Sequence, residues 1–405
     1  MSEFRVNSIT NQDGSAGPQV CGVSTFSGKS GVQIPSGSSQ FRRLDGGGRG
    51  RGVFLGGGYT PTPQTNTINF VEIATTGDAT NFGDLSETVR VAGNGTMSNS
   101  IRALNCGGAR SGDNKNIDEI IFATSGTAGI FGELTIIDGS NTWGSGVCSN
   151  STRGIIIGGG SDNQKSSQQK IELTSRGNGT IFGDLYADRG APNNGNRILY
   201  ATGFSSSTVG HITNYSTTAP DGDTIIFYTF SSLGKAQDFG EATIPKRMRT
   251  TCTNNTRGII AGGGFPTVVD TIEFVTMASK GNSTIFGDLN KIRGLGAAAN
   301  TVRGLFAGGK GNSLNLNLIY QITIASTGSQ SEFGNLTSGR RKPEGVSNST
   351  RACFAGGNVE PCGRVNIIDF VTISSAGDAQ DFGDLSLARE VGNSNSDSHG
   401  GLGGF

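Results

Sequence analysis

The chain has 405 residues, of which 67 are glycine, and only 16% are charged while 33% are hydrophobic. This composition excludes a disordered chain, which carries more charge and fewer β-forming residues, and the lack of a strict Gly-X-Y repeat excludes collagen. The 32 basic and 32 acidic residues are well mixed and give a formal net charge of zero, so the sequence lacks the basic stripe of a duplex-binding protein.

No apolar run of the sequence approaches the roughly 20 residues that a membrane span needs. The segment from Met1 to Arg5 lacks the apolar core of a secretory signal. We therefore expect a protein made and folded in a cytosol, with no membrane insertion and no nucleic-acid partner. In a reducing compartment the six cysteines are expected to be small, mostly buried side chains, and Cys353 and Cys362 are the pair to check for a disulfide.

Residues 1–45 form an N-terminal arm that does not match the rest of the chain. The arm has scattered glycines and apolar residues, and it is too small to hold a hydrophobic core alone. We expect it to pack on the following domain, on copies of itself or on another protein. The candidate docking residues are Phe4, Val6, Ile9, Val20, Val23, Phe26 and Ile34.

An arginine followed by apolar residues and a glycine cluster recurs through the rest of the chain. Clear copies stand at 51–58, 153–160, 257–264 and 303–309, and weaker copies begin at three further arginines. Successive arginines are separated by 51, 51, 44, 60, 46 and 48 residues. The repeated arginines are Arg51, Arg102, Arg153, Arg197, Arg257, Arg303 and Arg351.

A second motif, Phe-Gly-Asp-Leu or a close variant, keeps the same period. Its phenylalanines are Phe82, Phe131, Phe182, Phe239, Phe286, Phe333 and Phe382. A period of about 50 residues is the kelch value and exceeds that of a typical WD40 repeat. The two linked motifs therefore predict seven copies of one structural unit.

One unit, residues 257–300, indicates four short strands. They are expected at 257–261, 270–278, 284–289 and 293–299, with turns or glycine clusters between them. Four antiparallel strands per repeat are one blade of a β-propeller. The predicted fold is therefore an all-β, seven-bladed kelch-like β-propeller over residues 46–405, carried on the arm of residues 1–45.

The phase of the repeats predicts how the ring closes. The first unit begins at its second strand, near Arg51, and the last unit ends with a first strand near Arg389–Ser396. The C-terminal strand should therefore complete the first blade and leave no open edge. The glycine-rich strand is expected toward the axis, and the repeated phenylalanines are expected between blades.

The repeated arginines are predicted to be structural, because a substrate site is local whereas these recur in every unit. Their expected partners are the acids of the second motif, or backbone carbonyls. The acids are Asp84, Glu133, Asp184, Glu241, Asp288 and Asp384. The arginines that follow this motif, to which the same interpretation applies, are Arg90, Arg189, Arg293, Arg340 and Arg389.

The sequence offers little for catalysis or metal binding. His211 and His399 are far apart in the sequence and are not part of a metal-ligand pattern. Asp138–Trp143 is interpreted as an ordinary turn, and Trp143 as packing between blades rather than as a platform for a sugar. We predict no catalytic, metal or cofactor site.

The fourth unit differs most from the others. It inserts His211–Asp223 before an apolar strand, and Pro245–Arg249 replaces the usual small-residue strand. Insertions in repeat arrays commonly form loops on one face, often the binding face. The candidate binding residues are Tyr215, Asp221, Asp223, Lys246, Arg247 and Arg249.

The repeats of residues 51–390 resemble those of kelch-like proteins of tailed phages, especially contractile-tailed cyanophages. The resemblance is carried by Arg-Gly-Val-Phe-x-Gly-Gly-Gly, an Ile-rich strand and Phe-Gly-Asp-Leu. The arm segments 4–14, 17–20, 22–26 and 34–37 look like the N-terminal segment of such phages' fibre and structural proteins. The resemblance implies a virion component on the tail, baseplate, neck or head.

These observations predict a non-enzymatic virion protein. The arm would anchor to other virion proteins, and the propeller would serve as a decoration or a host-attachment module. Further expected partners are a host-surface glycan or protein and other copies of the chain. Two alternatives stay open. A glycan-binding or glycan-degrading propeller enzyme requires acids or histidines clustered in one or two blades, and an intracellular kelch adaptor requires a companion interaction domain.

Overall fold

The computed structural model describes residues 50–58, 64–89, 95–108, 115–135, 144–158, 167–184, 199–215, 223–232, 234–244, 246–264, 267–390 and 392–398. These residues lie in the compact unit Arg42–Phe405. The predicted arm and its boundary at residue 45 lie outside the described residues. All regular elements of the described residues are β-strands, and none of the described residues forms a helix that could cross a membrane.

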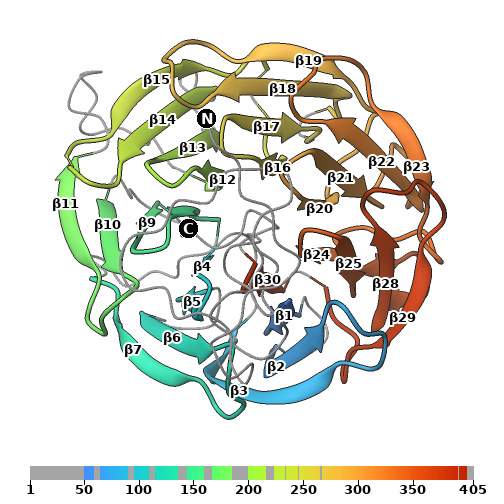
Figure 1. Ribbon diagram of the computed structural model, residues 1–405, viewed down its shortest axis with the longest axis horizontal. Coiled ribbons are helices and arrows are strands. Elements are labelled where there is room, and N and C mark those ends of the chain that lie inside the picture. Colours follow the sequence, from blue (N-terminus) through green and yellow to red (C-terminus); the bar gives the residue numbers. More distant parts are fainter. Residues whose placement is uncertain are drawn as a thin grey trace, which may run out of the picture. The chain divides into compact units, whose positions relative to one another are not determined.

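Seven four-stranded antiparallel sheets are arranged as a seven-bladed β-propeller, which confirms the predicted fold (Figure 1). We number the blades 1 to 7 in chain order. Glycine-rich turns and strands rich in β-branched residues account for this architecture. The strands are short, so the chain must reverse direction often in tight turns. Alternate side chains of each strand face the two neighbouring blades.

The strands fall into four concentric sets around the axis. From blade 1 to blade 7, the innermost strands are β30 (Asn393–Ser396), β4 (Thr96–Ser98), β8 (Gly146–Ser149), β12 (Leu199–Ser205), β16 (Thr250–Thr253), β20 (Gly296–Ala299) and β24 (Glu344–Ser347). In the same order, the second strands are β1 (Arg51–Leu55), β5 (Arg102–Cys106), β9 (Arg153–Ile157), β13 (Val209–Tyr215), β17 (Arg257–Ala261), β21 (Arg303–Ala307) and β25 (Arg351–Ala355).

The two outer sets complete each blade. The third strands are β2 (Thr65–Glu72), β6 (Asn116–Ile121), β10 (Ser167–Glu172), β14 (Thr224–Thr229), β18 (Thr271–Thr276), β22 (Leu318–Thr323) and β28 (Ile367–Thr372). The outermost strands are β3 (Thr80–Val89), β7 (Gly129–Glu133), β11 (Thr180–Asp184), β15 (Gln237–Glu241), β19 (Thr284–Asp288), β23 (Ser331–Asn335) and β29 (Gln380–Asp384). Blade 7 adds a small hairpin of β26 (Asn358–Val359) and β27 (Gly363–Arg364).

The ring closes as the repeat phase predicted. The C-terminal strand β30 pairs antiparallel with β1, so the first blade contains strands from both ends of the described chain. The Asp397 carboxylate also accepts hydrogen bonds from the backbone N–H groups of Gly50 and Arg51, at 2.9 and 3.0 Å. The closing strand therefore pairs with β1, and the residue after it bonds to the backbone at the start of β1.

The innermost position belongs to the small-residue strands, and the Arg-Gly strands stand second from the axis, so the expectation that the glycine-rich strand lies toward the axis was wrong (Figure 1). Neighbouring innermost strands contact one another around the ring. The four strands of the expected unit 257–300 form as predicted, but the fourth, β20, pairs with β21 of the next blade. The axial position requires the least side-chain volume, and Ala, Ser and Gly meet that requirement better than the Ile- and Phe-containing second strands.

The fourth blade corrects the repeat alignment. Arg197 lies outside the described residues, and the strand that follows it, β12, occupies the innermost position and not the second. The arginine position of this blade is filled by Val209, which pairs with Thr229 as Arg257 pairs with Thr276. The interpretation that every blade has this arginine was therefore wrong. Residues 211–215 belong to β13, and blade 5 retains a small innermost strand after residue 249.

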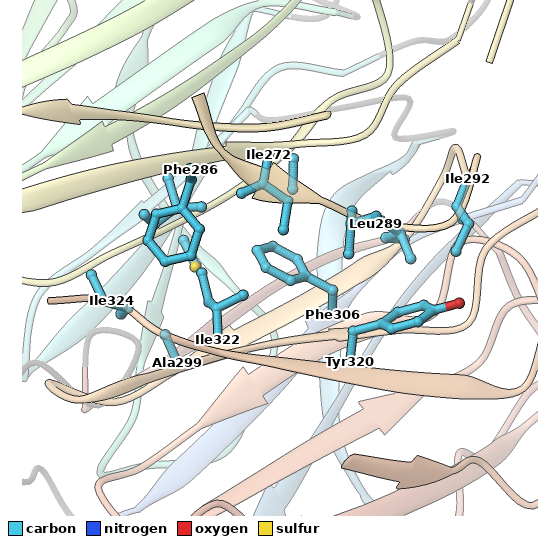
Figure 2. Close-up of a cluster of buried hydrophobic side chains, with 13 residues drawn as sticks. Ile272, Phe286, Leu289, Ile292, Ala299, Phe306, Tyr320, Ile322 and Ile324 are labelled. Carbon is cyan, nitrogen blue, oxygen red and sulfur yellow. The ribbon is translucent and has the colours of Figure 1, made fainter. Parts of the chain in front are cut away.

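Each seam between neighbouring blades contains one cluster of buried hydrophobic side chains. Six of these clusters in the described structure include a phenylalanine of the second motif, and Phe182 packs against the remaining one. At the seam of blades 5 and 6, Phe286 and Ile272 of one blade meet Phe306 and Ile322 of the next (Figure 2). Burial of these rings therefore joins blades rather than strands within a blade.

The glycine of the second motif has a specific steric role at the outer rim. A Cβ atom at Gly383 would come within 2.6 Å of the carbonyl oxygen of Gly77 in the next blade, and its φ is +140°. The Gly77 N–H donates to the Phe382 carbonyl oxygen at 2.7 Å. The same contact recurs between Gly287 and Gly328. Only glycine lets the two backbones approach closely enough for this bond.

Candidate functional site

An axial cavity of about 290 Å³ runs between the innermost strands of all seven blades. Its lining combines small and hydroxyl-bearing residues such as Ser98, Ser205 and Ala298 with a few larger side chains such as Met97. None of the described lining residues is an Asp, Glu, Lys, Arg or His. The cavity can accommodate water or a small polar molecule, but its described side chains supply no ordinary general acid or base.

The hydroxyl groups beside the cavity bond across the seams. Ser205 donates to the Ser149 carbonyl oxygen at 2.6 Å, Ser347 to that of Ala299 at 2.8 Å, and Ser396 to that of Ser347 at 2.9 Å. These bonds occupy carbonyl groups at the free edges of the innermost strands. The polar lining is therefore used largely to hold the blades together.

The cysteines next to the cavity are not activated thiols. Burial raises the pKa of Cys252 to about 12 and raises the pKa of Cys148 above its ordinary value. Because a thiolate is the reactive form, both thiols are poor nucleophiles. Cys106 and Cys353 are also buried, whereas Cys362 is exposed and forms no disulfide with Cys353. Cys21 lies outside the described residues.

Five of the six described repeated arginines bond to backbone carbonyls of the next blade, which is the second of the two expected kinds of partner. Arg303 Nη1 donates to the Ile373 carbonyl oxygen at 2.9 Å, and Arg257 Nη1 to that of Ile324 at 3.1 Å. The carboxylates that pair with some of these arginines lie on the third strands, whereas the Phe-Gly-Asp motif lies on the outermost strands. They are Glu72, Glu119 and Glu172, paired with Arg51, Arg102 and Arg153.

Two of the arginines that follow the second motif form buried bonds to the next blade. Arg340 pairs with Asp369 at 2.8 Å, and both side chains are fully enclosed. Arg389 donates to the carbonyl oxygens of Gly56 and Thr67 and to the side chain of Asn69. Burial lowers the pKa of Arg389 to about 10, opposed by the nearby Glu344 carboxyl. Arg293 is partly exposed, and Arg90 and Arg189 lie outside the described residues.

The candidate binding residues of blade 4 do not form one described site. We call the end of the propeller where second strands end and third strands begin the loop face, and the opposite end the turn face. On the loop face, Lys246 donates to Thr267 at 3.2 Å at an exposed position. Arg249 is only 5% exposed and stands 3.9 Å from Glu273, which makes it a seam residue and not a surface one.

The other members of that predicted set are only partly placed. Asp223 and Arg247 are half-buried at the ends of their loops. The backbone of Tyr215 ends β13, and its side chain, like all of Asp221, lies outside the described part of the chain. Trp143, Asp138, His399 and the seven docking residues of the arm lie outside it as well.

His211 is a core residue. It is fully buried in β13, stacks on Phe204 with ring centroids 5.2 Å apart, and meets the edge of Phe239 at 4.6 Å. Burial lowers the pKa of His211 to about 4, so the ring is neutral at physiological pH. Among the described residues, no group of His, Cys, Asp or Glu is arranged to hold a metal ion.

A charged cluster on the loop face of blades 6 and 7 was missed by sequence reasoning. Lys310 pairs with Glu360 at 2.8 Å, and Arg341 lies 3.8 Å from Glu360 and 3.9 Å from Glu390. These residues stand in loops of different length in each unit, so the repeat pattern does not align them. The paired charges link loops of neighbouring blades.

Comparisons with known proteins do not assign the chain to a family. No protein-family model matches the sequence, and no curated protein matches it either. The fold and the local chemistry of the blades are therefore the grounds on which a function is proposed.

Proposed function

We propose that the chain is a non-enzymatic component of a tailed-phage virion, with residues 1–45 as its anchor and the propeller as a decoration or host-attachment module. The observation that carries the proposal is the use of the recurring polar groups. Repeated arginines, turn glycines such as Gly77 and axial hydroxyls bond between blades, which suits a rigid body that presents its surface. The resemblance of the repeats and arm to phage structural proteins supports the virion location.

The proposal makes the arm and propeller separable in function. The arm would bind other virion proteins, while the propeller, whose seams are closed on themselves, would need no virion protein to fold. The outer surface would then contact the host, where many weak contacts on one particle add up to firm attachment.

Virion location is tested by mass spectrometry and cryo-electron microscopy of purified particles produced from the genome that encodes the chain. We expect the protein in purified particles at a fixed copy number, as a disc-shaped density. A variant without residues 1–45 should be absent from the particles while its propeller stays folded in the lysate. Full-length protein that is abundant in the lysate and absent from particles would contradict the proposal.

A further inference from the structure

The surroundings of the repeated arginine differ between blades. In blades 1 and 3 it faces a carboxylate on the third strand, Arg51 with Glu72 at 2.7 Å and Arg153 with Glu172 at 3.0 Å. The aligned partner of Arg303 in blade 6 is Thr323. The guanidinium of blade 6 therefore faces an uncharged, exposed residue where blades 1 and 3 supply an anion.

A second support of the arginine is also missing in blade 6. Arg51, Arg257 and Arg351 stand over the rings of Phe70, Phe274 and Phe370, 4.3, 4.5 and 4.7 Å from the ring centroids. The residue aligned with these phenylalanines in blade 6 is Gln321, opposite Leu305. In blade 6, Gln321 therefore stands where blades 1, 5 and 7 have an aromatic ring, and Thr323 stands where blades 1 and 3 have a carboxylate.

A pocket of about 220 Å³ opens at this place on the turn face. Arg303, Gln321 and Thr323 line it together with the hydroxyl-rich turn 326–329 and Ser331. Gln321 and Ser331 are register partners on neighbouring strands, so their side chains point to the same face of the sheet. Glu332 follows Ser331 and therefore points to the opposite face.

The pocket is held open by bonds that do not involve a ligand. The Gly328 N–H donates to the Phe286 carbonyl oxygen of blade 5 at 2.9 Å, and the Ser326 N–H donates to the Thr323 carbonyl oxygen at 3.1 Å. Arg303 Nη1 is fixed by the carbonyl oxygen of Ile373 in blade 7. A preformed site of this kind loses little conformational freedom when a ligand binds.

We propose that this pocket, the blade 6 pocket, binds the carboxylate of an acidic sugar. The ligand carboxylate takes the place that Glu72 and Glu172 occupy in blades 1 and 3, and a guanidinium offers it two parallel N–H donors. The surrounding hydroxyl and amide groups match the hydroxyls of a sugar ring. The assignment rests on the proposed attachment role, to which it adds the ligand class.

The test is ligand-observed NMR on the full-length protein with D-glucuronate, D-glucose and acetate as probes. We expect saturation transfer to glucuronate and much less to glucose or acetate. Thr323→Glu supplies an internal carboxylate as in blades 1 and 3, so it should abolish glucuronate binding while it keeps the Arg303 bond to blade 7. Arg303→Gln should weaken binding by about tenfold or more, the usual loss for a charged hydrogen-bonding partner.

The matched control is Thr276→Glu in blade 5, where Phe274 already covers the arginine, and it should leave glucuronate binding unchanged. Binding that survives Thr323→Glu, or acetate that binds as tightly as glucuronate, would overturn the assignment. If glucuronate fails to bind a protein that is found on virions, the ligand class is wrong and the proposed function stands. If glucuronate binds at this pocket but the protein is absent from virions, the pocket stands and the virion role is wrong.

Discussion

The seam between blades 7 and 1 and the seam between blades 5 and 6 have the same backbone design and different polar chemistry. At one position of the third strand, the first seam places Asn69 against the Arg389 guanidinium, and the second places Tyr320, which accepts a hydrogen bond from Asn290 at 2.8 Å. Both seams carry the glycine contact at the rim and a buried apolar cluster.

This comparison indicates which features a seam requires. The backbone contact through a motif glycine recurs because the distance between blades allows no side chain there. The central polar pair varies because any pair that satisfies its own hydrogen bonds fits. The 7–1 seam, beside which the first blade combines strands from opposite ends of the described chain, adds charged groups and the Asp397 hydrogen bonds.

Removal of the closing strand should have the largest effect. A chain that ends before Asn393 lacks β30, so β1 loses its partner and its edge is exposed at the centre of the ring. We expect the shorter chain to aggregate and to lose cooperative folding, and soluble yield and size-exclusion chromatography measure this. A chain that ends after Ser398 keeps β30 and should fold normally. Normal folding of the shorter chain would show that the 7–1 seam needs no closing strand.

Adding a methyl group to the rim glycines tests the part that both seams share. Gly383→Ala and Gly287→Ala each place a Cβ atom against the backbone of the next blade, so each should lower the free energy of unfolding by about 3 kcal/mol or more. Denaturant titration measures the loss. The control is Gly377→Ala, where a Cβ atom meets nothing within 4 Å. A loss at only one of the two seams would contradict a shared design.

The pH dependence of stability should be larger at the 7–1 seam. Burial raises the pKa of Glu344 to about 8, opposed by a hydrogen bond from Ser394 and by the charges of Lys342 and Arg389. The pKa of a glutamate in the unfolded chain is about 4.3. As the pH rises from there toward 8, the unfolded chain releases a proton that the folded chain keeps. The free energy of unfolding therefore falls over this range, by less than about 1.4 kcal/mol per pH unit because the residue is partly exposed.

Glu344→Gln keeps the shape of the side chain and removes its titration. Urea unfolding at pH 5, 6.5 and 8 should show that the variant gains stability over the parent protein as the pH rises. Glu332→Gln, an exposed carboxyl on blade 6, serves as the control. Parallel pH profiles for the parent protein and Glu344→Gln would disprove the role of this carboxyl.

The smallest effect is expected from the neutral pair of the 5–6 seam. Tyr320→Phe removes one hydroxyl and leaves the Asn290 amide, which is at an exposed position, to bond with water, so the free energy of unfolding should fall by about 1 kcal/mol at most. Thermal unfolding measures the change. Asn69→Ala, which leaves the buried Arg389 with one partner fewer, should cost more in the same assay. Equal losses would mean that the charge at the closing seam contributes nothing extra.

The repeat pattern predicted the blades well and the individual sites poorly. Residues equivalent to Phe286 and Gly287 stand at the same place in every unit. A residue type that recurs in this way indicates a contact that recurs in every unit. Arg197 misled the alignment because in the sequence this Arg comes before an innermost strand, β12, and only the strand pairing shows that Val209 occupies the arginine position. The candidate binding face was inferred from an insertion on the loop face, whereas the blade 6 pocket lies on the turn face.

The sequence by itself determined the number of blades, the strand order and the closure by the C-terminal strand, because these follow from local period and phase. The tertiary structure decided which strand faces the axis, which atoms the arginines bond to, and where an arginine lacks its usual partners. Those outcomes depend on residues about 20 to 80 positions apart, such as Arg303 with Thr323 and with Ile373, and no local pattern states which of them meet.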